Sequence, residues 1–305
     1  MPRNEPTAVS DVARRRRLVV VRAGDSSLHP TWLQGPDSPE FDLVVSYYGD
    51  DAARYRSQVE NRIDRKGGKW DGLAALFASR PDLLDAYDYF WLPDDDIAAD
   101  TRTINGIFDA MAANALELAQ PSLTLDSYYT YITYLRCRGF ALRYSTAIEI
   151  MAPCLSSGLL RRVLPLVANS PSGWGLDPVW TRMNADNRRK SAILDQWPIR
   201  HTRPVGGPLY QNMAKRGRSA WDDLATMRSQ FGVSRLYPMI YAARDAHGGE
   251  WVNQAALGLR MALGYVIDRP RIPHYNLARG NILTLTRRAV YHKADLRPVR
   301  TGQES

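Results

Sequence analysis

The fold of this 305-residue chain is decided by the stretch DYFWLPDDDI, which occupies residues 88–97. Aromatic and branched side chains are typical of a covered β-strand, and Pro93 ends the strand because it cannot donate to the ladder. Three carboxylates follow, and carboxylate oxygens suit Mn²⁺ or Mg²⁺. Because open α/β sheets bind ligands beyond the carboxyl ends of their strands, we favour a metal site over a solvated acidic turn.

Strands and helices alternate on both sides of this stretch. Residues 18–21 and 41–48 predict two more buried strands, and helical spacing is expected over 70–79, 104–118 and 156–167. This alternation predicts an α/β fold with a mainly parallel central sheet that is flanked by helices. In such a sheet the strand ends at 23–25, 47–50 and 94–96 share one edge.

We expect three regions along the chain: a disordered basic segment over 1–16, an α/β domain over 17–212 and a helical C-terminal extension over 213–305. Two amphipathic helices are predicted in the extension, at about 221–230 and 251–266. They carry aromatic side chains among basic ones: Trp221, Tyr237, Tyr241, Trp251 and Tyr265. Such surfaces could cover the site, form a homodimer or rest on an anionic membrane. The alternative is plain packing against the sheet.

Composition limits the classes of partner. The net charge of +8 and the pI near 9.5 suit an anionic ligand or surface. The basic residues are scattered rather than gathered with aromatic residues, so we expect no nucleic-acid partner. No stretch approaches the roughly 18 to 20 apolar residues that span a bilayer, and the polar residues 2–13 do not form a signal peptide. The two cysteines lie in apolar stretches, which favours reduced thiols in a cytosolic protein.

Two phosphate-binding fingerprints are absent after the first strand, namely G-x-G-x-x-G and the P-loop. Their absence argues against dinucleotide-dependent oxidoreductases and P-loop enzymes. Phosphate charge would then have to be neutralised by a cation and by basic side chains such as Arg22 or Lys69. Lys69 lies in KGGKW, residues 66–70, and could instead be an ordinary solvated lysine.

Two later stretches also suggest chemistry. In GWGLD, residues 173–177, Trp174 could stack on a sugar or base, and Asp177 could act as a general base or only cap a helix. In PIRHTRPVGG, residues 198–207, His201 could complete a metal site, although a lone histidine is more often an ordinary residue. The flanking Arg200 and Arg203 could hold phosphate oxygens.

Together these parts resemble type A glycosyltransferases, which use nucleotide-sugar donors and combine Asp-x-Asp, Gly-Trp-Gly-x-Asp and a later His. Over about residues 18–210 the chain more closely resembles the plant family named lysine-ketoglutarate reductase trans-splicing-related. Five segments in matching order carry this resemblance: KW at 69–70, YFWLPDDD at 89–96, IEIMAP at 148–153, GWGLD at 173–177 and HTRPVGG at 201–207. The resemblance implies a Rossmann-like, type A glycosyltransferase-like fold. The reductase label has no support because the nicotinamide fingerprint is absent.

The implied activity is metal-dependent transfer of a sugar, such as a hexose, from a nucleotide-sugar donor to a hydroxyl of a glycan or lipid-linked acceptor. Mn²⁺ or Mg²⁺ held by Asp94, Asp96 and His201 would bind the donor diphosphate. Asp177 would take the acceptor proton, which implies inversion, while Glu149 organises the site or shares the base role. The remaining donor-contacting side chains would be Asp95, Lys69, Arg22, Arg200, Arg203 and Trp174.

Two departures from the plant pattern matter. Relatives often have Trp-Asp-Glu-Asp where this chain has Leu92-Pro93-Asp94-Asp95-Asp96. Plant relatives tend to carry an N-terminal membrane anchor, whereas this chain begins with a polar, Arg-rich segment. That suits a cytosolic bacterial enzyme of polysaccharide biosynthesis, peripheral to the inner membrane. Two other functions stay open: a nucleotidyltransferase with the same metal-diphosphate site, and a noncatalytic protein that binds nucleotide sugar or glycan.

Overall fold

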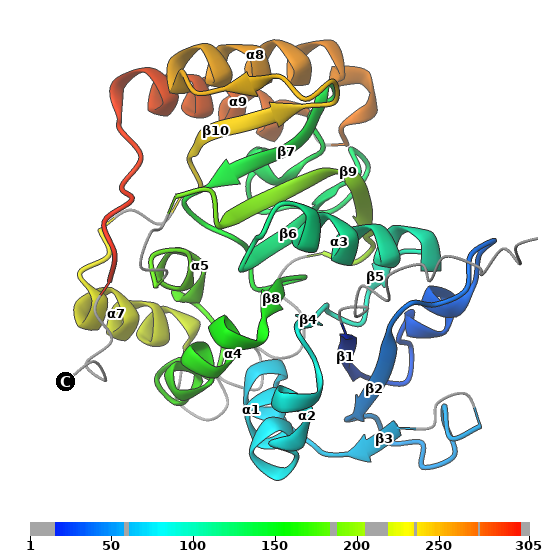
Figure 1. The fold of residues 1–305 in the computed structure, drawn as a ribbon. Helices are drawn as coiled ribbons and strands as arrows, with labels where there is room; N and C mark the ends of the chain where they lie inside the picture. Colours follow the sequence, from blue (N-terminus) through cyan, green and yellow to red (C-terminus); the bar gives the residue numbers. More distant parts are fainter. Residues whose placement is uncertain are drawn as a thin grey trace, which may run out of the picture.

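A computed structural model describes residues 16–57, 61–183, 188–204, 219–234, 237–273 and 275–299. The expected disordered segment over 1–16 lies outside the described residues, except for Arg16. The last three residues of the HTRPVGG segment, Val205, Gly206 and Gly207, also lie outside them. Helices surround a central mixed sheet (Figure 1). No described helix is both long and apolar enough to cross a membrane.

The first half of the sheet is parallel. It contains β3 (Asn61–Asp64), β2 (Asp42–Tyr47), β1 (Arg17–Ala23) and β4 (Tyr89–Trp91), in that spatial order. Every residue of β1 is buried, because helices cover both faces of this region. The two strands expected at 18–21 and 41–48, and the one before the acidic triplet, are therefore confirmed.

The second half is mainly antiparallel. From β4 outward it continues through β8 (Cys154–Ser156), β6 (Leu118–Leu123), β9 (Ser191–His201), β7 (Phe140–Ser145), β10 (Ile240–Asp245) and β11 (Glu250–Trp251). Only the pair of β6 with β9 is parallel here, and β5 (Ile97–Ala98) pairs antiparallel with β9. The expectation of a mainly parallel sheet thus holds for the first half only. It fails for the second half because the apolar sequence of a buried strand does not reveal the direction in which the strand runs.

Helices pack on this sheet from several sides. Their bounds are α1 (Lys69–Ser79), α2 (Asp82–Ala86), α3 (Thr101–Ala113), α4 (Ser157–Val163), α5 (Leu176–Trp180), α7 (Ala220–Phe231), α8 (Gln254–Ile267) and α9 (Tyr275–Tyr291). Short 3₁₀ segments are η1 (His29–Leu33), η2 (Ile132–Tyr134), η3 (Leu164–Asn169) and η4 (Arg269–Arg271). The expected cap of α4 is confirmed, since Ser156 Oγ accepts a hydrogen bond from the amide of Leu159 at 3.2 Å.

The C-terminal region contains strands as well as the expected helices. The two expected helices correspond to α7 and α8, but β10 also joins the sheet beside β7, and α9 follows α8. Leu257, Met261 and Tyr265 of α8 are buried in the same hydrophobic cluster as β1. At the upper end of Figure 1, α8 and α9 lie over β10 and β7. The described part of this region and the sheet therefore share one core.

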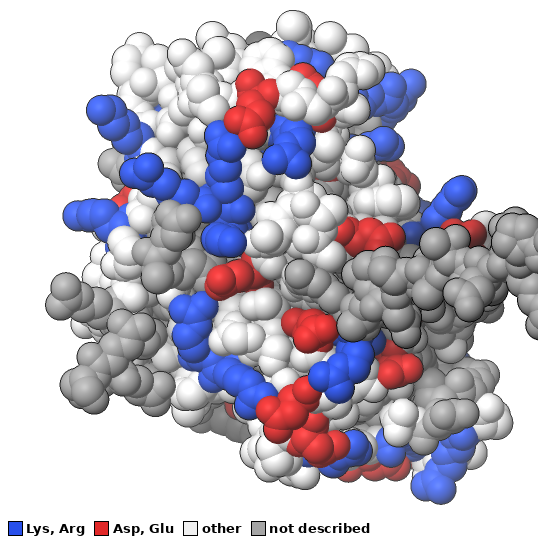
Figure 2. All heavy atoms as spheres, in the orientation of Figure 1, with Lys and Arg blue, Asp and Glu red and all other residues white. Residues whose placement is uncertain are grey.

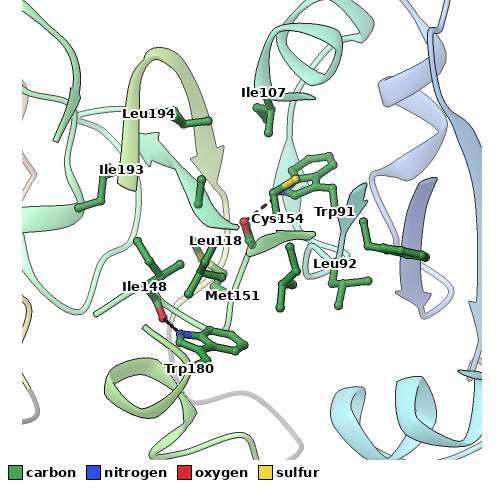
Figure 3. Packing of buried hydrophobic residues seen from close by; sticks show 14 of the residues in the cluster. Trp91, Leu92, Ile107, Leu118, Ile148, Met151, Cys154, Trp180, Ile193 and Leu194 are labelled. Carbon is green, nitrogen blue, oxygen red and sulfur yellow. Dashed lines mark hydrogen bonds between the residues drawn. The ribbon is translucent and has the colours of Figure 1, made fainter. Parts of the chain in front are cut away.

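Two buried tryptophans fix the segment that joins β7 to β8. Trp91 Nε1 donates to the carbonyl oxygen of Ala152 at 3.1 Å, and Trp180 Nε1 donates to that of Ile148 at 2.9 Å (Figure 3). The segment between these two bonds carries Glu149. Its position is thus set by apolar packing from both sides.

Candidate active site

The acidic triplet forms a turn directly after β4, and each of its carboxylates contacts a different cation. Asp94 Oδ1 lies 2.7 Å from Lys69 Nζ, and Asp95 Oδ1 lies 3.2 Å from Arg203 Nη1. Asp96 Oδ2 lies 3.3 Å from His201 Nε2. The turn sends neighbouring side chains in different directions, so three acids can stand side by side in sequence without facing one another.

Asp95 ties the three expected strand ends together. Its Oδ2 accepts a hydrogen bond from the amide of Gly24 after β1 at 2.8 Å, and another from Tyr48 Oη after β2 at 3.1 Å. A Cβ at Gly24 would come within 2.9 Å of the Tyr48 ring, so this close approach requires glycine. The prediction that the three strand ends share one edge is confirmed.

Lys69 is not a solvated lysine. It begins α1, its side chain is 13% exposed, and its ammonium also donates to the carbonyl oxygens of Ile150 and Met151 at 2.7 and 2.8 Å. Burial lowers the pKa of Lys69, and the charge of Asp94 opposes that shift. The lysine therefore links the acidic turn to the segment that carries Glu149.

Asp177 and Glu149 are the other two acids of the site. Asp177, in the first turn of α5, accepts a hydrogen bond from the amide of Ile150 at 3.0 Å. Glu149 Oε1 accepts one from Thr130 Oγ1 at 2.8 Å, while its buried Oε2 has no hydrogen-bond partner among the described residues. Burial raises the pKa of both carboxyls, and the charge of Glu149 raises the pKa of Asp177 further. Both acids can therefore hold or take up a proton nearer to neutral pH than ordinary carboxylates.

His201 ends β9 and faces Asp96. Its Nδ1 lies 3.0 Å from the carbonyl oxygen of Tyr128, which can only accept, so Nδ1 carries a hydrogen. Burial alone would lower the pKa of His201, but the hydrogen bond to Asp96 and the nearby acids outweigh burial and raise the pKa. An imidazolium that donates to Asp96 fits this arrangement.

A divalent cation does not fit the site in this arrangement. Asp94 is occupied by Lys69 and Asp96 by His201, and no three His, Cys, Asp or Glu side chains among the described residues form a group that could hold a metal ion. One oxygen, Asp96 Oδ1, is buried and has no hydrogen-bond partner in this part of the chain. Metal binding by Asp94, Asp96 and His201 would require Lys69 to release Asp94.

Three of the expected donor-binding side chains lie apart from the acidic turn. Arg22 is 4% exposed and donates to Ser46 Oγ at 2.7 Å and to the carbonyl oxygen of Gly67 at 2.8 Å, which ties β1 to β2 and to the loop before α1. Arg200 pairs with Asp126 at 2.9 Å on the surface, because successive side chains of a strand point to opposite faces. Trp174 packs edge-on against Trp221, with ring centroids 4.9 Å apart.

Sequence reasoning missed several supporting residues. Tyr48 holds Asp95, and Thr130 holds Glu149. Gln120 Oε1 accepts a hydrogen bond from the amide of Glu149 at 2.5 Å. Only Tyr48 had a signal, because it lies at an expected strand end. Thr130 and Gln120 act through contacts across 19 and 29 residues of chain.

Comparisons with known proteins show limited likeness. No family model and no curated protein matches the chain, so the resemblance to the plant family stays a prediction. Among solved structures, TarS from S. aureus is 10% identical over 90% of this chain, with a TM-score of 0.44, and the match covers only 54% of TarS. TarS 1–349 in complex with UDP-GlcNAc is 12% identical over 90% of each chain, with a TM-score of 0.42.

A putative nucleotide-diphospho-sugar transferase from Desulfovibrio desulfuricans G20 is also similar. It is 11% identical over 47% of this chain and 64% of that one, with a TM-score of 0.31.

Proposed function

We propose that this protein is a glycosyltransferase that moves a sugar from a nucleotide-sugar donor to a hydroxyl of a glycan or lipid-linked acceptor. One observation carries the proposal: charged side chains from all five motif segments meet at one place. They are Lys69, Asp94, Asp96, Glu149, Asp177 and His201, and they influence one another's charge state. Five segments spread over more than 130 residues converge in this way when they build a common site.

Two protein cations at the acidic turn could pass from their present partners to the donor diphosphate. Lys69 and Arg203 reach the acidic turn from α1 and from the segment after β9, and Arg203 is also held by the carbonyl oxygen of Ser26 at 2.5 Å. Arginine and lysine both bind phosphate oxygens well. Asp95 already accepts bonds from Gly24, Tyr48 and Arg203, so we assign it a positioning role rather than a donor contact.

A carboxylate with a raised pKa is suited to take the acceptor proton, because a general base works best when its pKa lies near the working pH. Asp177 fits this role, since the amide of Ile150 holds one of its oxygens and thereby fixes its orientation. Glu149 is the second candidate, because its buried Oε2 has no partner among the described residues. Attack on the anomeric carbon by a hydroxyl activated in this way inverts its configuration.

A thermal-shift screen against nucleotide sugars tests the donor site. Binding at 100 times Kd adds about 2.7 kcal/mol to the free energy of unfolding, which raises Tm by roughly 4 °C. We expect one donor to give this shift, Lys69→Met to abolish it and Asp126→Asn, a surface variant, to retain it. If no nucleotide sugar shifts the parent protein, the proposal is wrong.

The same screen with Mn²⁺ or with EDTA tests the metal. If the donor-induced rise in Tm persists in EDTA and in the Asp94→Asn variant, protein cations neutralise the diphosphate. A shift that needs Mn²⁺ and disappears in Asp94→Asn and Asp96→Asn would confirm the metal site expected from sequence. Release of pyrophosphate from a nucleoside triphosphate would identify a nucleotidyltransferase instead, and binding without turnover would identify a noncatalytic protein.

A further inference from the structure

The outer face of α8 is unusual because every exposed residue on it is apolar. The larger side chains are Leu259, Leu263, Val266 and Ile267, which are 53%, 57%, 49% and 69% exposed. Their spacing of i, i+4, i+7 and i+8 places them on one stripe, which we call the α8 outer face. The opposite side of the helix buries Leu257, Met261 and Tyr265 in the core. The helix is therefore apolar on both sides, although only one side is covered by protein.

Two other helices, α7 and α3, do not share this pattern. The exposed residues of α7 include Asp222, Thr226 and Arg228, and those of α3 include Arg102 and Asp109. A helix that is apolar on all sides is normally buried in protein or lipid. A contiguous exposed patch of large aliphatic side chains marks a contact surface. The α8 outer face is thus expected to be covered by something other than water.

Exposed basic residues lie at the C-terminal end of this face. Residues 252–294 contain seven Lys or Arg and a single acid, Asp268, which accounts for +6 of the net charge of +8. The Asp268 side chain is only 6% exposed and lies 3.5 Å from Arg138 and 2.9 Å from Arg271, so it is already balanced. The side chains of Arg138 and Arg271 are 59% and 58% exposed, and the exposed Arg269 lies beside them. Figure 2 shows largely uncharged surface at the top of the view, where α8 lies, with both basic and acidic groups below it.

We infer that the α8 outer face docks on an anionic lipid surface. Outward-pointing aliphatic side chains match the acyl boundary of such a surface, and the arginines beside them match its charged headgroups. A second copy of this chain is a poorer occupant, because its own α8 outer face is bordered by the same Arg138, Arg269 and Arg271 and offers no acid to complement them.

Two aromatic residues that the sequence suggests for such a surface, Tyr265 and Trp221, do not take part in it. Tyr265 is fully buried, and its hydroxyl donates to the carbonyl oxygen of Leu135 at 2.8 Å. Trp221 is 67% exposed, but it lies on α7 and packs against Trp174. The docking residues are therefore the aliphatic ones of α8.

Vesicle sedimentation tests this inference. The parent protein should pellet with vesicles that contain phosphatidylglycerol, remain in the supernatant with pure phosphatidylcholine, and bind less as salt rises. Leu259→Gln/Leu263→Gln removes apolar contact without changing charge, and should weaken partitioning by tenfold or more. Arg269→Gln/Arg271→Gln should weaken it by a similar factor. The exposed controls Leu33→Gln and Arg80→Gln/Arg102→Gln should bind like the parent.

Each outcome is decisive once circular dichroism shows that every variant is folded. Equal recovery in the supernatant with both vesicle types would overturn the inference. So would unchanged binding of Leu259→Gln/Leu263→Gln. A concentration-dependent dimer that disappears in this variant, together with no vesicle binding, would assign the face to self-association instead. None of these measurements depends on glycosyl transfer, so the proposed function is tested separately.

Discussion

Asp94, Asp95 and Asp96 stand next to one another in the chain, yet each carboxylate contacts a different cation. A buried or half-buried carboxylate is costly unless it is paired, and burial still raises the pKa of Asp94 and Asp95 although both are paired. Lys69 starts a helix and His201 ends a strand. At the residue scale, the site is therefore a set of charge pairs whose geometry is fixed by the backbone around them.

Asp177→Asn tests the general base at this scale. The amide keeps an oxygen that can accept the bond from Ile150, but it cannot take a proton. We expect the donor-induced rise in Tm to survive and sugar transfer to fall by about 10²-fold or more. Glu149→Gln is the matched variant. Near-normal transfer by Asp177→Asn together with loss in Glu149→Gln would make Glu149 the base.

His29 predicts a dependence of stability on pH. It is fully buried, its Nδ1 lies 2.8 Å from Ser27 Oγ, and burial lowers its pKa from 6.5 to about 4. Between these two pKa values the unfolded chain binds more protons than the folded one. The contribution of a neutral His29 to the free energy of unfolding is therefore fully present above pH 6.5 and is lost as the pH falls toward 4. The loss from pH 7 to pH 5 should be about 2 kcal/mol.

Urea unfolding at both pH values measures this loss. His29→Phe keeps a ring against Tyr55 and Trp32 but does not titrate, so its free energy of unfolding should fall by about 2 kcal/mol less between pH 7 and pH 5 than that of the parent. An equal decrease in both proteins would show that other groups cause it.

At the scale of elements, α8 joins the C-terminal part of the chain to the rest. Its inner side packs into the core, and Gly258 lets it approach α9 closely, because a Cβ there would overlap with the Cβ of Ala289. Its outer side carries the apolar stripe. One face of α8 thus packs on the core and another on α9, and glycine is needed only on the face toward α9.

Two glycines of α8 provide a matched pair of substitutions. Gly258→Ala should destabilise the protein by about 1–3 kcal/mol, because the overlap with Ala289 outweighs the better helix propensity of alanine. At Gly264 an added Cβ would lie 3.5 Å from Arg260 and Cys137, which is ordinary contact. Gly264→Ala should therefore stabilise by up to about 1 kcal/mol. Thermal denaturation distinguishes the two, and equal effects would contradict this account of the helix contact.

At the scale of the whole molecule, a buried ion pair connects the sheet to the C-terminal helices. Arg143 of β7 and Asp195 of β9 are both completely buried, with Arg143 Nε 2.6 Å from Asp195 Oδ2. Arg143 also donates to the carbonyl oxygens of Thr133 and Leu135, and Tyr265 of α8 reaches Leu135 as well. The described C-terminal elements thus fold as part of the sheet rather than beside it.

Asp195→Asn should lower the free energy of unfolding by about 3–5 kcal/mol, because it leaves Arg143 buried without its counter-charge. Asp126→Asn removes the partner of Arg200 on the surface and should cost less than about 1 kcal/mol. Urea unfolding measures both values. A small effect of Asp195→Asn would mean that the carbonyl oxygens alone satisfy Arg143.

Local patterns determined much of this protein before any tertiary contact was known. The apolar runs of β1, β2 and β4, the stop at Pro93, the cap at Ser156 and the meeting of three strand ends all follow from the sequence. These features depend on side chains within a few residues of one another, or on the rule that parallel strands end at one edge. The sequence also predicts the charged residues of the site, namely Lys69, Asp94, Asp96, Glu149, Asp177 and His201.

Tertiary structure alone decided which strands and which charged side chains pair with one another. The directions of β7, β8 and β10, the burial of Arg22, and the pairing of Lys69 with Asp94 and of His201 with Asp96 rest on contacts between residues far apart in the chain. The apolar sequence of a buried strand does not reveal whether the strand runs parallel or antiparallel to its neighbours. Likewise, the sequence around a lysine does not show whether its side chain is solvated or paired with an aspartate. The exposure of the α8 outer face likewise cannot be predicted from the sequence. Helical spacing shows that a stripe of apolar side chains exists, but not whether protein covers it.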